Sequence, residues 1–245
     1  MSAEDLLFGR NPVEEALKNH PERVEKIYIR DSGGAGLKTI IDLASASRIP
    51  VQKVPGKKLH DMVGPVNDQG VVAQMSEIEY LEMDDWLLGV HIETNPMVMV
   101  LDELEDVANF GAILRTAAAS GVDAVIVPKH RQAPVNSTVY KTSAGTAGMI
   151  PIIRVVNINQ ALITLKEAGF WVVGLDQNAK TTLWQQDLIM PLVVIVGSEG
   201  KGIRQHTLKQ CDFTVSMPMQ NNVESLNASV SAALLCYEVV RQKMK

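Results

Sequence analysis

The feature of this sequence that most limits its fold is a series of short apolar runs that alternate with helix-like stretches from Pro96 onward. Each run is four to six residues long and rich in aliphatic side chains, which is typical of strands buried on both faces. This alternation predicts an α/β fold with a parallel sheet that helices cover on both sides. The expected strands are Met97–Leu101, Ala124–Val127, Ile152–Val156, Phe170–Leu175, Leu192–Val196 and Phe213–Met217. The expected helices are Asn109–Ser120, Ser137–Gly145, Asn159–Ala168, Ile203–Lys209 and Ser225–Lys243.

The loops after these strands are where chemistry is expected, because ligands of parallel sheets bind beyond the carboxyl ends of the strands. The last expected helix also carries a set of side chains that helical spacing brings to one face. This set is Leu226, Val230, Ala233, Leu234, Tyr237 and Val240.

Residues 1–75 are expected to form a smaller α/β unit. Its first helix would span Pro12–Lys18, with Asn11 as the N-cap and Pro12 at the first helical position. The glycine-rich stretch 33–38 lacks the spacing of a phosphate-binding loop, so a flexible turn is expected there. The other expected elements are strands at Lys26–Ile29, Pro50–Val54 and Gly70–Gln74 and a helix at Leu37–Ser47.

The charge distribution suggests how the chain is divided. The formal net charge is −5, and residues 76–95 contain six acidic residues and no Lys or Arg, so the whole excess lies in that segment. The expected domains are therefore residues 1–75, an acidic linker at 76–95, and residues 96–245. Residues 1–75 and 96–245 each have a net charge close to zero, so charge alone neither demands nor excludes a nucleic-acid partner.

Several classes of protein are disfavoured by what the sequence lacks. Cys211 and Cys236 are too few for a disulfide framework, and no signal peptide or apolar run long enough for a membrane helix is visible, so a soluble cytoplasmic protein is expected. The histidines are scattered, so no metal site is expected. Walker and nucleophile-elbow motifs are missing, which favours a group-transfer enzyme whose cofactor supplies the reactivity.

Three loops could carry that chemistry. In residues 101–116, Asn109 and Arg115 either cap a helix and meet solvent or face the cleft at the strand ends. Residues 197–202 contain three glycines, which allow either a plain turn or a close backbone approach to a ligand. In residues 216–229, Ser225 or one of its neighbours is expected to cap the last helix, whereas Asn227 just inside it favours a side-chain role.

Taken in order, these loops resemble the three motifs of the SpoU (TrmH) family in the SPOUT superfamily, whose members are S-adenosylmethionine-dependent RNA ribose 2′-O-methyltransferases. The first motif matches at Asn109, Gly111 and Arg115, and the second at Gly197, Glu199, Gly200 and Gly202. The third matches at Met217, Pro218, Met219, Ser225, Leu226, Asn227 and Ser229.

The N-terminal part resembles the L30e-like substrate-binding domain found in this family. The resemblance rests on residues 8–13 and 68–73. With that domain, the chain is similar to the bacterial members that methylate a guanosine of 23S rRNA near the peptidyl-transferase centre. Two positions depart from the family pattern, since Val107 stands where Pro is usual and Asp68 where His is usual.

The resemblance implies a deep trefoil knot in the C-terminal domain, a homodimer formed through that domain, and a set of site residues. The cofactor would meet Gly174, Gly197, Met217 and Leu226. Arg115 would activate the ribose hydroxyl, which we interpret as phosphate binding and oxyanion stabilisation because a guanidinium keeps its proton. Asn109, Ser225 and Asn227 would position the ribose, and Glu199 would organise the second loop.

RNA affinity is expected from the N-terminal domain, with Arg10, Lys57 and Lys58 as candidate phosphate contacts. The motifs do not specify the class of RNA, so a tRNA ribose 2′-O-methyltransferase stays open beside the rRNA enzyme. A non-catalytic RNA-binding or ribosome-assembly protein on the same fold is a third reading.

Overall fold

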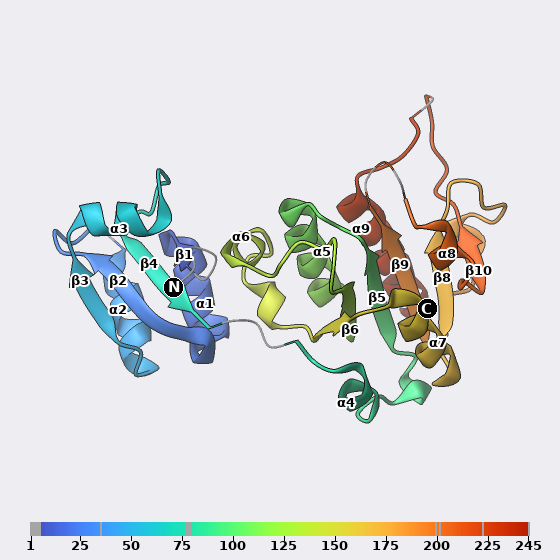
Figure 1. Ribbon diagram of the computed structural model, residues 1–245, viewed down its shortest axis with the longest axis horizontal. Coiled ribbons are helices and arrows are strands. Elements are labelled where there is room, and N and C mark those ends of the chain that lie inside the picture. The colour runs from blue at the N-terminus through green and yellow to red at the C-terminus, as the bar shows by residue number, and fades with distance from the viewer. Residues whose placement is uncertain are drawn as a thin grey trace. The chain divides into compact units, whose positions relative to one another are not determined.

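The computed structural model describes residues 6–34, 36–76, 80–198, 200, 202–221 and 223–244 (Figure 1). Its internal contacts divide the chain into two compact units. The first contains Met1–Ile78 and Pro134–Gly148, and the second contains Glu79–Ala133 and Met149–Lys245. The short segment 134–148 therefore contacts the first unit although it comes between two strands of the second.

The first unit is a four-stranded sheet with helices packed on it. The strands lie in the order β1-β4-β2-β3, in which β2 and β3 are parallel and the other pairs are antiparallel. A core of Leu6, Tyr28, Val54, Leu59 and Val72 lies between sheet and helices. The strands are β1 (Leu6–Phe8), β2 (Val24–Arg30), β3 (Val51–Val54) and β4 (Val71–Met75). The helices are α1 (Arg10–Asn19), α2 (Leu37–Ala46), α3 (Gly56–Val63) and α6 (Ser137–Thr142), with short 3-10 turns at Pro21–Arg23 and Thr146–Gly148.

The N-cap expected for the first helix is wrong. Helix α1 begins at Arg10, and Gly9 precedes it with a φ of +91° and no side-chain cap. Asn11 and Pro12 are therefore inside the first turn, where a missing N–H costs nothing because the first four amides of a helix have no partner in it. A turn precedes α2 as expected, since Gly33 and Gly36 have φ values of +70° and +86°, but residues 37 and 38 already belong to the helix and the flexibility of the turn stays a prediction.

The second unit contains the six-stranded parallel sheet that the apolar runs predict. The strand order is β10-β8-β9-β5-β6-β7, and every neighbouring pair is parallel. The strands are β5 (Met97–Asp102), β6 (Ala124–Pro128), β7 (Ile152–Val155), β8 (Trp171–Leu175), β9 (Leu192–Gly197) and β10 (Phe213–Val215). The helices are α4 (Met83–Leu87), α5 (Val107–Ser120), α7 (Ile158–Glu167), α8 (Gln205–Leu208) and α9 (Ala228–Lys243), with 3-10 turns at Ile92–Thr94 and Leu183–Gln185. The trefoil knot stays a prediction.

Helices cover both faces of this sheet, which confirms the expected layering. One face buries Val98, Val100, Ile126 and Val193 against Leu162 and Leu165 of α7. Helices α5 and α9 pack against each other, and α9 also contacts β9, on the other face (Figure 1). The residues of β5 are all buried, because a parallel strand in the middle of such a sheet has no solvent face.

The acidic segment 76–95 lies mostly in the second unit and contains apolar residues that pack on its core. Helix α4 presents Met83, Trp86 and Leu87 to the core under β6 and β7, and the Trp86 ring lies 6.3 Å from the ring of Phe170. The carboxylates of Asp84 and Asp85 lie in the first turn of the same helix. The segment is therefore amphipathic, with its charges in solvent and its apolar side chains on the core.

The last helix differs from the expectation in its start and in its buried face. Helix α9 begins at Ala228 rather than Ser225. Its buried face is formed by Ala232, Leu235, Cys236 and Val239, whereas Val230, Leu234 and Tyr237 stay 46%, 37% and 50% exposed. The apolar set that helical spacing brings together is thus largely on the outer face. No helix among the described residues is long and apolar enough to cross a membrane.

Candidate functional site

A cavity of about 340 Å³ opens at the carboxyl edge of the second unit's sheet. Three adjacent strands end there, β8 at Leu175, β9 at Gly197 and β10 at Val215. Its walls combine backbone from the loops after these strands with a few apolar side chains. The lining residues are Leu175, Asp176, Gln177, Asn178, Val196, Gly197, Ser198, Gly200, Gly202, Ile203, Gln205, Leu208, Val215, Met217, Met219, Glu224, Ser225, Leu226, Ala228 and Ser231.

The loop after β9 closes so tightly that its first residue has no room for a side chain. A Cβ on Gly197 would lie 2.1 Å from the carbonyl carbon of Gly202 and 2.3 Å from its oxygen. The Gly202 amide also donates to the Ser198 carbonyl at 2.9 Å, which holds the turn. Gly200 and Gly202 have φ values of +76° and +65°, a region that side chains disfavour. The glycines therefore present bare backbone to the cavity.

An ion pair between the buried Asp102 and the partly exposed Arg204 fixes the far end of this loop. Asp102 is fully buried at the end of β5 and accepts from the Arg204 amide at 3.0 Å and from Arg204 Nε at 2.8 Å. Arg204 Nη2 lies 2.6 Å from the same carboxylate, and Nη1 lies 2.7 Å from Glu103. Burial lowers the pKa of Arg204, but the hydrogen bond and charge of Asp102 outweigh burial and raise it. Arg204 follows the lining residue Ile203, so the pair ties the cavity wall to the neighbouring strand.

A side-chain hydrogen bond joins the first and third loops. Asn227 Nδ2 donates to Asn109 Oδ1 at 2.9 Å, and the two residues come from the N-terminal ends of α9 and α5. The reading of Asn109 as a cap is wrong, whereas the last helix is capped by a neighbour of Ser225. Asp106 caps α5 by accepting from the Asn109 amide at 2.7 Å, and Asn227 rather than Ser225 caps α9 by accepting from the amides of residues 229 and 230. Ser225 lies in the loop before the helix, where it is exposed and lines the cavity.

Arg115 lies away from this cavity, on the exposed side of α5. It forms no hydrogen bond or ion pair with the residues that the structure describes. On this helix Ala112 lies three residues before Arg115, and Thr116 lies four residues after Ala112 on the same face as Ala112. Ala112 and Thr116 line an open apolar groove between α5 and α9, together with Trp184, Ser229, Val230, Ala233, Leu234, Tyr237 and Glu238.

Three of the four expected cofactor residues line the cavity, namely Gly197, Met217 and Leu226. Gly174 does not. It lies inside β8, where a Cβ would be 2.8 Å from the sulfur of Cys211 and 3.3 Å from side-chain carbons of Ile203 and Leu208, so its small size serves packing. Glu199 lies outside the described residues.

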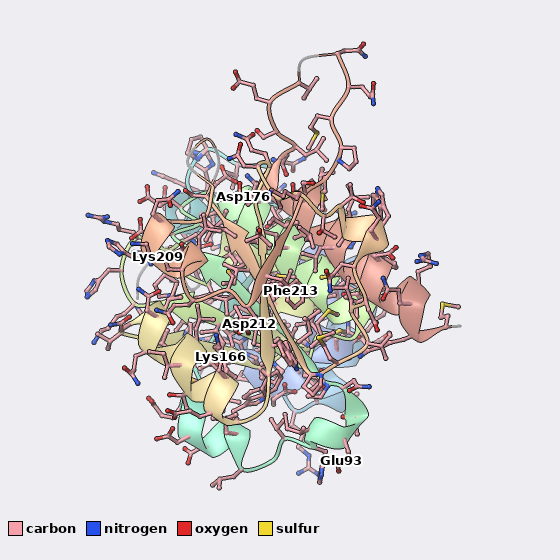
Figure 2. All side chains as sticks on the ribbon, turned by 90° about the vertical axis from the view of Figure 1, so that its right-hand side faces the viewer. Glu93, Lys166, Asp176, Lys209, Asp212 and Phe213 are labelled. Atoms are coloured by element: carbon pink, nitrogen blue, oxygen red, sulfur yellow. The ribbon has the colours of Figure 1, made fainter. Side chains whose placement is uncertain are left out.

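The loop directly after β8 contributes polar groups that the motifs did not single out. Asp176 lies at the cavity end of the sheet, whereas Asp212 and Lys166 lie towards the other end, where Lys166 Nζ is 2.6 Å from Asp212 Oδ1 (Figure 2). Asp176 accepts from the amide of Asn178 at 2.9 Å, which shapes the turn. The only sequence signal for these residues is that they follow an apolar run, which says where a loop lies but not what it binds.

The site contains no reactive thiol. Burial raises the pKa of Cys236 to about 12, and burial followed by the charge of Asp212 does the same for Cys211. Both cysteines are free and neither lines the cavity. Within the described residues, no group of three or more His, Cys, Asp or Glu side chains could hold a metal ion.

A second cluster of functional interest lies at one edge of the first unit's sheet. Arg10 follows β1, Arg30 ends β2, and Lys57 and Lys58 follow β3. The edge also holds the turn before β4, because the Arg30 amide donates to Gly70 at 2.9 Å. The expected phosphate contacts thus lie at the edge that also holds Arg30. Sequence reasoning missed Arg30, because the sequence at the end of a strand does not indicate which residues lie next to it in the fold.

Backbone and side chains of the turn at 68–70 hold the two arginines. Arg10 donates from its amide to Gln69 Oε1 at 2.9 Å and from Nε to the Gln69 carbonyl at 3.1 Å. Asp68 is buried, accepts from the Gly70 amide at 2.6 Å and lies 3.3 Å from Arg30 Nη2. Asp68, which departs from the family pattern, therefore has a structural role here. Val107, the other departure, is the first residue of α5, and the Asp106 cap begins that helix without proline.

The fold and the arrangement of the site define a class of protein, and comparison with known families identifies it. Residues 96–237 match the SpoU rRNA Methylase family, and residues 6–81 match the family described as RNA 2'-O ribose methyltransferase substrate binding. The chain belongs to the SpoU rRNA methylase family.

The chain matches individual relatives over almost its whole length. The chain is 39% identical to the 23S rRNA (guanosine-2'-O-)-methyltransferase RlmB of Pseudomonas putida, covering 99% of this chain and 98% of that protein. It is 41% identical to YacO of Bacillus subtilis, which is assigned to the TrmH family of tRNA/rRNA methyltransferases, covering 98% and 96%. Among solved structures, the SpoU methyltransferase AviRb of Streptomyces viridochromogenes, in complex with AdoMet, shares the fold, with a TM-score of 0.79, 24% identity, and coverage of 98% and 90%.

Proposed function

We propose that this protein transfers a methyl group from S-adenosylmethionine to the ribose 2′-hydroxyl of a guanosine in 23S rRNA. The observation that carries the proposal is the cavity at the carboxyl edge of the parallel sheet, whose walls include residues of the second and third family motifs. Family membership supports the reaction, and the RlmB relative of nearly equal length supports the substrate.

The lining of the cavity fits this cofactor. Its volume of about 340 Å³ is in the range of small-ligand sites, roughly 300–1,000 Å³. The apolar side chains of Val196, Ile203 and Leu226 suit an adenine ring, and the bare backbone of the glycine loop lets the ligand approach closely. Asp176 offers a carboxylate to hydroxyl or ammonium groups. When bound, the cofactor supplies an electrophilic methyl group, so the protein needs no nucleophile of its own.

We assign Arg115 to binding the RNA that accepts the methyl group. A guanidinium cannot take up the proton of the ribose hydroxyl, because its pKa is above about 12. It binds the adjacent RNA phosphate and stabilises the negative charge that develops on the 2′-oxygen. Its exposure on α5, free of partners among the described residues, leaves all its donors available for RNA.

The other motif residues act mainly by positioning. The bond between Asn227 and Asn109 holds the third loop against the first, so that ribose-binding groups keep their places. Ser225, exposed at the cavity, is the side chain we assign to direct contact with the ribose. Glu199 is proposed to organise the second loop.

The first unit is proposed to bind RNA through the edge that carries Arg10, Arg30, Lys57 and Lys58. Its match to a substrate-binding family over residues 6–81 supports this division of labour. The domain bounds 1–75, 76–95 and 96–245 stay a prediction. The knot stays part of the proposal for the second unit. An rRNA substrate and two free cysteines fit the cytoplasm as the location.

A homodimer is proposed through the groove between α5 and α9. Trp184, Val230 and Tyr237 leave 48%, 46% and 50% of their surface exposed there, which a second copy of the same face would cover. Arg115 lies on α5, which forms one wall of this groove, but it is not among the lining residues. In sedimentation, the wild type should have the mass of a dimer, and the variant with Val230 and Tyr237 replaced by Glu should have the mass of a monomer. Equal masses for the wild type and the variant would contradict this interface.

One experiment separates the candidate functions. The full chain is incubated with methyl-labelled S-adenosylmethionine and transcripts of 23S rRNA and tRNA, and the labelled nucleotide is mapped. Label on a single guanosine ribose of 23S rRNA is expected. Label on tRNA alone would support the second reading, and RNA binding without transfer would support a non-catalytic protein.

A further inference from the structure

The loop after β6 is a basic tip in the second unit that the site described above does not use. Lys129, His130 and Arg131 follow the strand directly, and all three are exposed. Arg131 leaves 71% of its side chain in solvent and has one ion pair, a long one of 3.5 Å to Glu103. The side chains of Lys129 and His130 make no hydrogen bond or ion pair with any described residue. Lys129 and Arg131 are thus two exposed cationic side chains in one loop, and only Arg131 has an ion pair with a described residue.

The backbone of this loop is fixed. The Lys129 amide donates to Val155 at 2.8 Å, and Arg154 donates from Nη2 to the Lys129 carbonyl at 3.3 Å. The guanidinium of Arg154 lies 5.0 Å from the centre of the Tyr80 ring, which holds it in place. Arg131 has a φ of +56°, a conformation that a long side chain adopts only when its surroundings impose it. The tip is therefore preorganised.

The tip also lies against the loop that leads to the first motif. The Leu104 amide donates to Gln132 Oε1 at 3.2 Å, and the Ala133 amide donates to the Leu104 carbonyl at 2.9 Å. Leu104 precedes Asp106, the cap of the helix that carries Asn109 and Arg115. Because β5 and β6 are parallel neighbours, their loops share the carboxyl edge at which the cofactor cavity opens.

None of the nearby acidic groups forms an ion pair with Lys129 among the described residues. Glu103 is shared between Arg204 and Arg131, and Asp106 accepts from the Asn109 amide. Glu105 is the remaining exposed carboxylate on that loop. Lys129 has no ion pair with a described residue and Arg131 shares Glu103 with Arg204, so both side chains can bind a ligand whose groups are anionic and repeat along a chain, as RNA phosphates do.

We propose that Lys129 and Arg131 bind backbone phosphates of the RNA beside the target nucleotide, as a second RNA contact that belongs to the catalytic unit. The inference rests on the proposed methylation of RNA. Arg154 and Gln132 position the loop, and the two cations make the contact. The first unit would supply general affinity, while this loop would hold the RNA strand near the cofactor.

The test compares Arg131→Asn with Arg48→Asn in the full chain. Both arginines are exposed and have left-handed backbone, with φ values of +56° and +58°, and Asn tolerates that conformation. Arg48 follows α2 at the start of β3, at the opposite edge of the first unit's sheet from Arg10 and Arg30. The probe is a 23S rRNA transcript, and its Kd is measured at several salt concentrations.

Arg131→Asn should weaken RNA binding several-fold at physiological salt and lower the slope of log K against log salt by about 0.7–0.9. Adding Lys129→Gln should lower the slope by a similar amount again. The KM for RNA should rise while the KM for S-adenosylmethionine stays unchanged. Calorimetry with the demethylated cofactor checks the fold, and if Arg131→Asn disturbs it, Lys129→Gln alone decides.

A salt slope equal to that of Arg48→Asn in both loop variants would overturn the proposal. The wild type is assayed for methyl transfer in parallel. If it methylates no RNA, the proposed function fails. If it methylates RNA and the loop variants keep the wild-type slope, only the role of this loop fails.

Discussion

Two sheet edges in this protein are built in the same way and equipped for different ligands. In the second unit, strands β8, β9 and β10 end at a cavity walled by glycine backbone and apolar side chains. In the first unit, β1, β2 and β3 end beside Arg10, Arg30, Lys57 and Lys58. A concave edge lined with backbone suits one small ligand, whereas an edge bearing cations suits a polyanion of any length.

The difference shows how recognition of the cofactor and recognition of RNA are divided between the two units. Specific recognition of a small cofactor depends on shape, so a single added methyl group can abolish it. Recognition of phosphates depends on the number of charges, so the loss of one cation has a graded effect that salt modulates. Arg115 belongs to neither edge, because it lies on the outer face of α5.

The largest effect is expected from Arg115→Ala, which would separate chemistry from both kinds of binding. Methyl transfer should fall by at least about 10²–10³-fold, the cost of removing one preorganised donor to a developing oxyanion. Affinity for the demethylated cofactor in calorimetry should stay within about twofold of wild type, because Arg115 does not line the cavity. Arg115→Lys keeps the charge but loses the bidentate fork, and should recover part of the rate. Wild-type turnover in Arg115→Ala would refute the assignment.

Gly197→Ala should disrupt the glycine loop that walls the cavity of the second unit. The new Cβ would lie 2.1 Å from the carbonyl carbon of Gly202, so the loop must open. We expect cofactor affinity to fall by roughly 100-fold while RNA binding persists. Gly89→Ala is the matched control, since its Cβ would meet only the Trp86 carbonyl at 3.7 Å, an ordinary contact. Equal cofactor affinity in the two variants would show that the glycine loop is not the cofactor wall.

Sequence reasoning reached much of this edge, because its signals are local. The apolar runs predicted all six strands of the larger sheet, and the spacing of glycines located the loop at 197–202. The face of α9 is the instructive case. Helical spacing brings Val230, Leu234 and Tyr237 together, but spacing alone does not say which face meets the core, and here these residues are exposed.

The remaining misses depend on contacts between distant parts of the chain. Strand β1 has only three residues, too few for a period-2 pattern, and it forms by pairing with β4 more than sixty residues later. Arg30 reaches the turn at 68–70 only through the pairing of β2 with β4. Gly174 suits a cofactor loop by its place in the sequence, but it packs against Cys211 from another part of the chain.

Arg204→Gln should affect the same cavity through its support. It would leave the fully buried Asp102 without its guanidinium, and we expect a loss of about 2–3 kcal/mol. This is less than the roughly 3–5 kcal/mol for a completely buried pair, because the Arg204 side chain is 43% exposed and water can approach. Cofactor affinity should fall about tenfold as the loop loosens.

The control for that variant is Lys166→Gln, which removes the 2.6 Å ion pair with Asp212 in the same unit, towards the other end of the sheet (Figure 2). It should lower the thermal midpoint slightly and leave cofactor affinity unchanged. A loss of cofactor affinity that merely follows the loss of stability in both variants would mean that the ion pair with Asp102 has no specific part in holding the loop.

The last effect, a loss of RNA affinity that depends on salt, is expected at the basic edge of the first unit. Lys57→Gln with Lys58→Gln removes two charges near the start of α3 and should weaken RNA binding by about tenfold at physiological salt. The slope of log K against log salt should fall by about 1.4–1.8, because RNA binding with two fewer phosphate contacts releases fewer counterions. The matched control, Lys18→Gln with Arg48→Asn, removes the same charge from the opposite edge of the same sheet. Because the net charge of the two variants is equal, a difference in slope would reflect location alone. Equal slopes would mean that the edge beside Arg30 has no privileged contact with RNA.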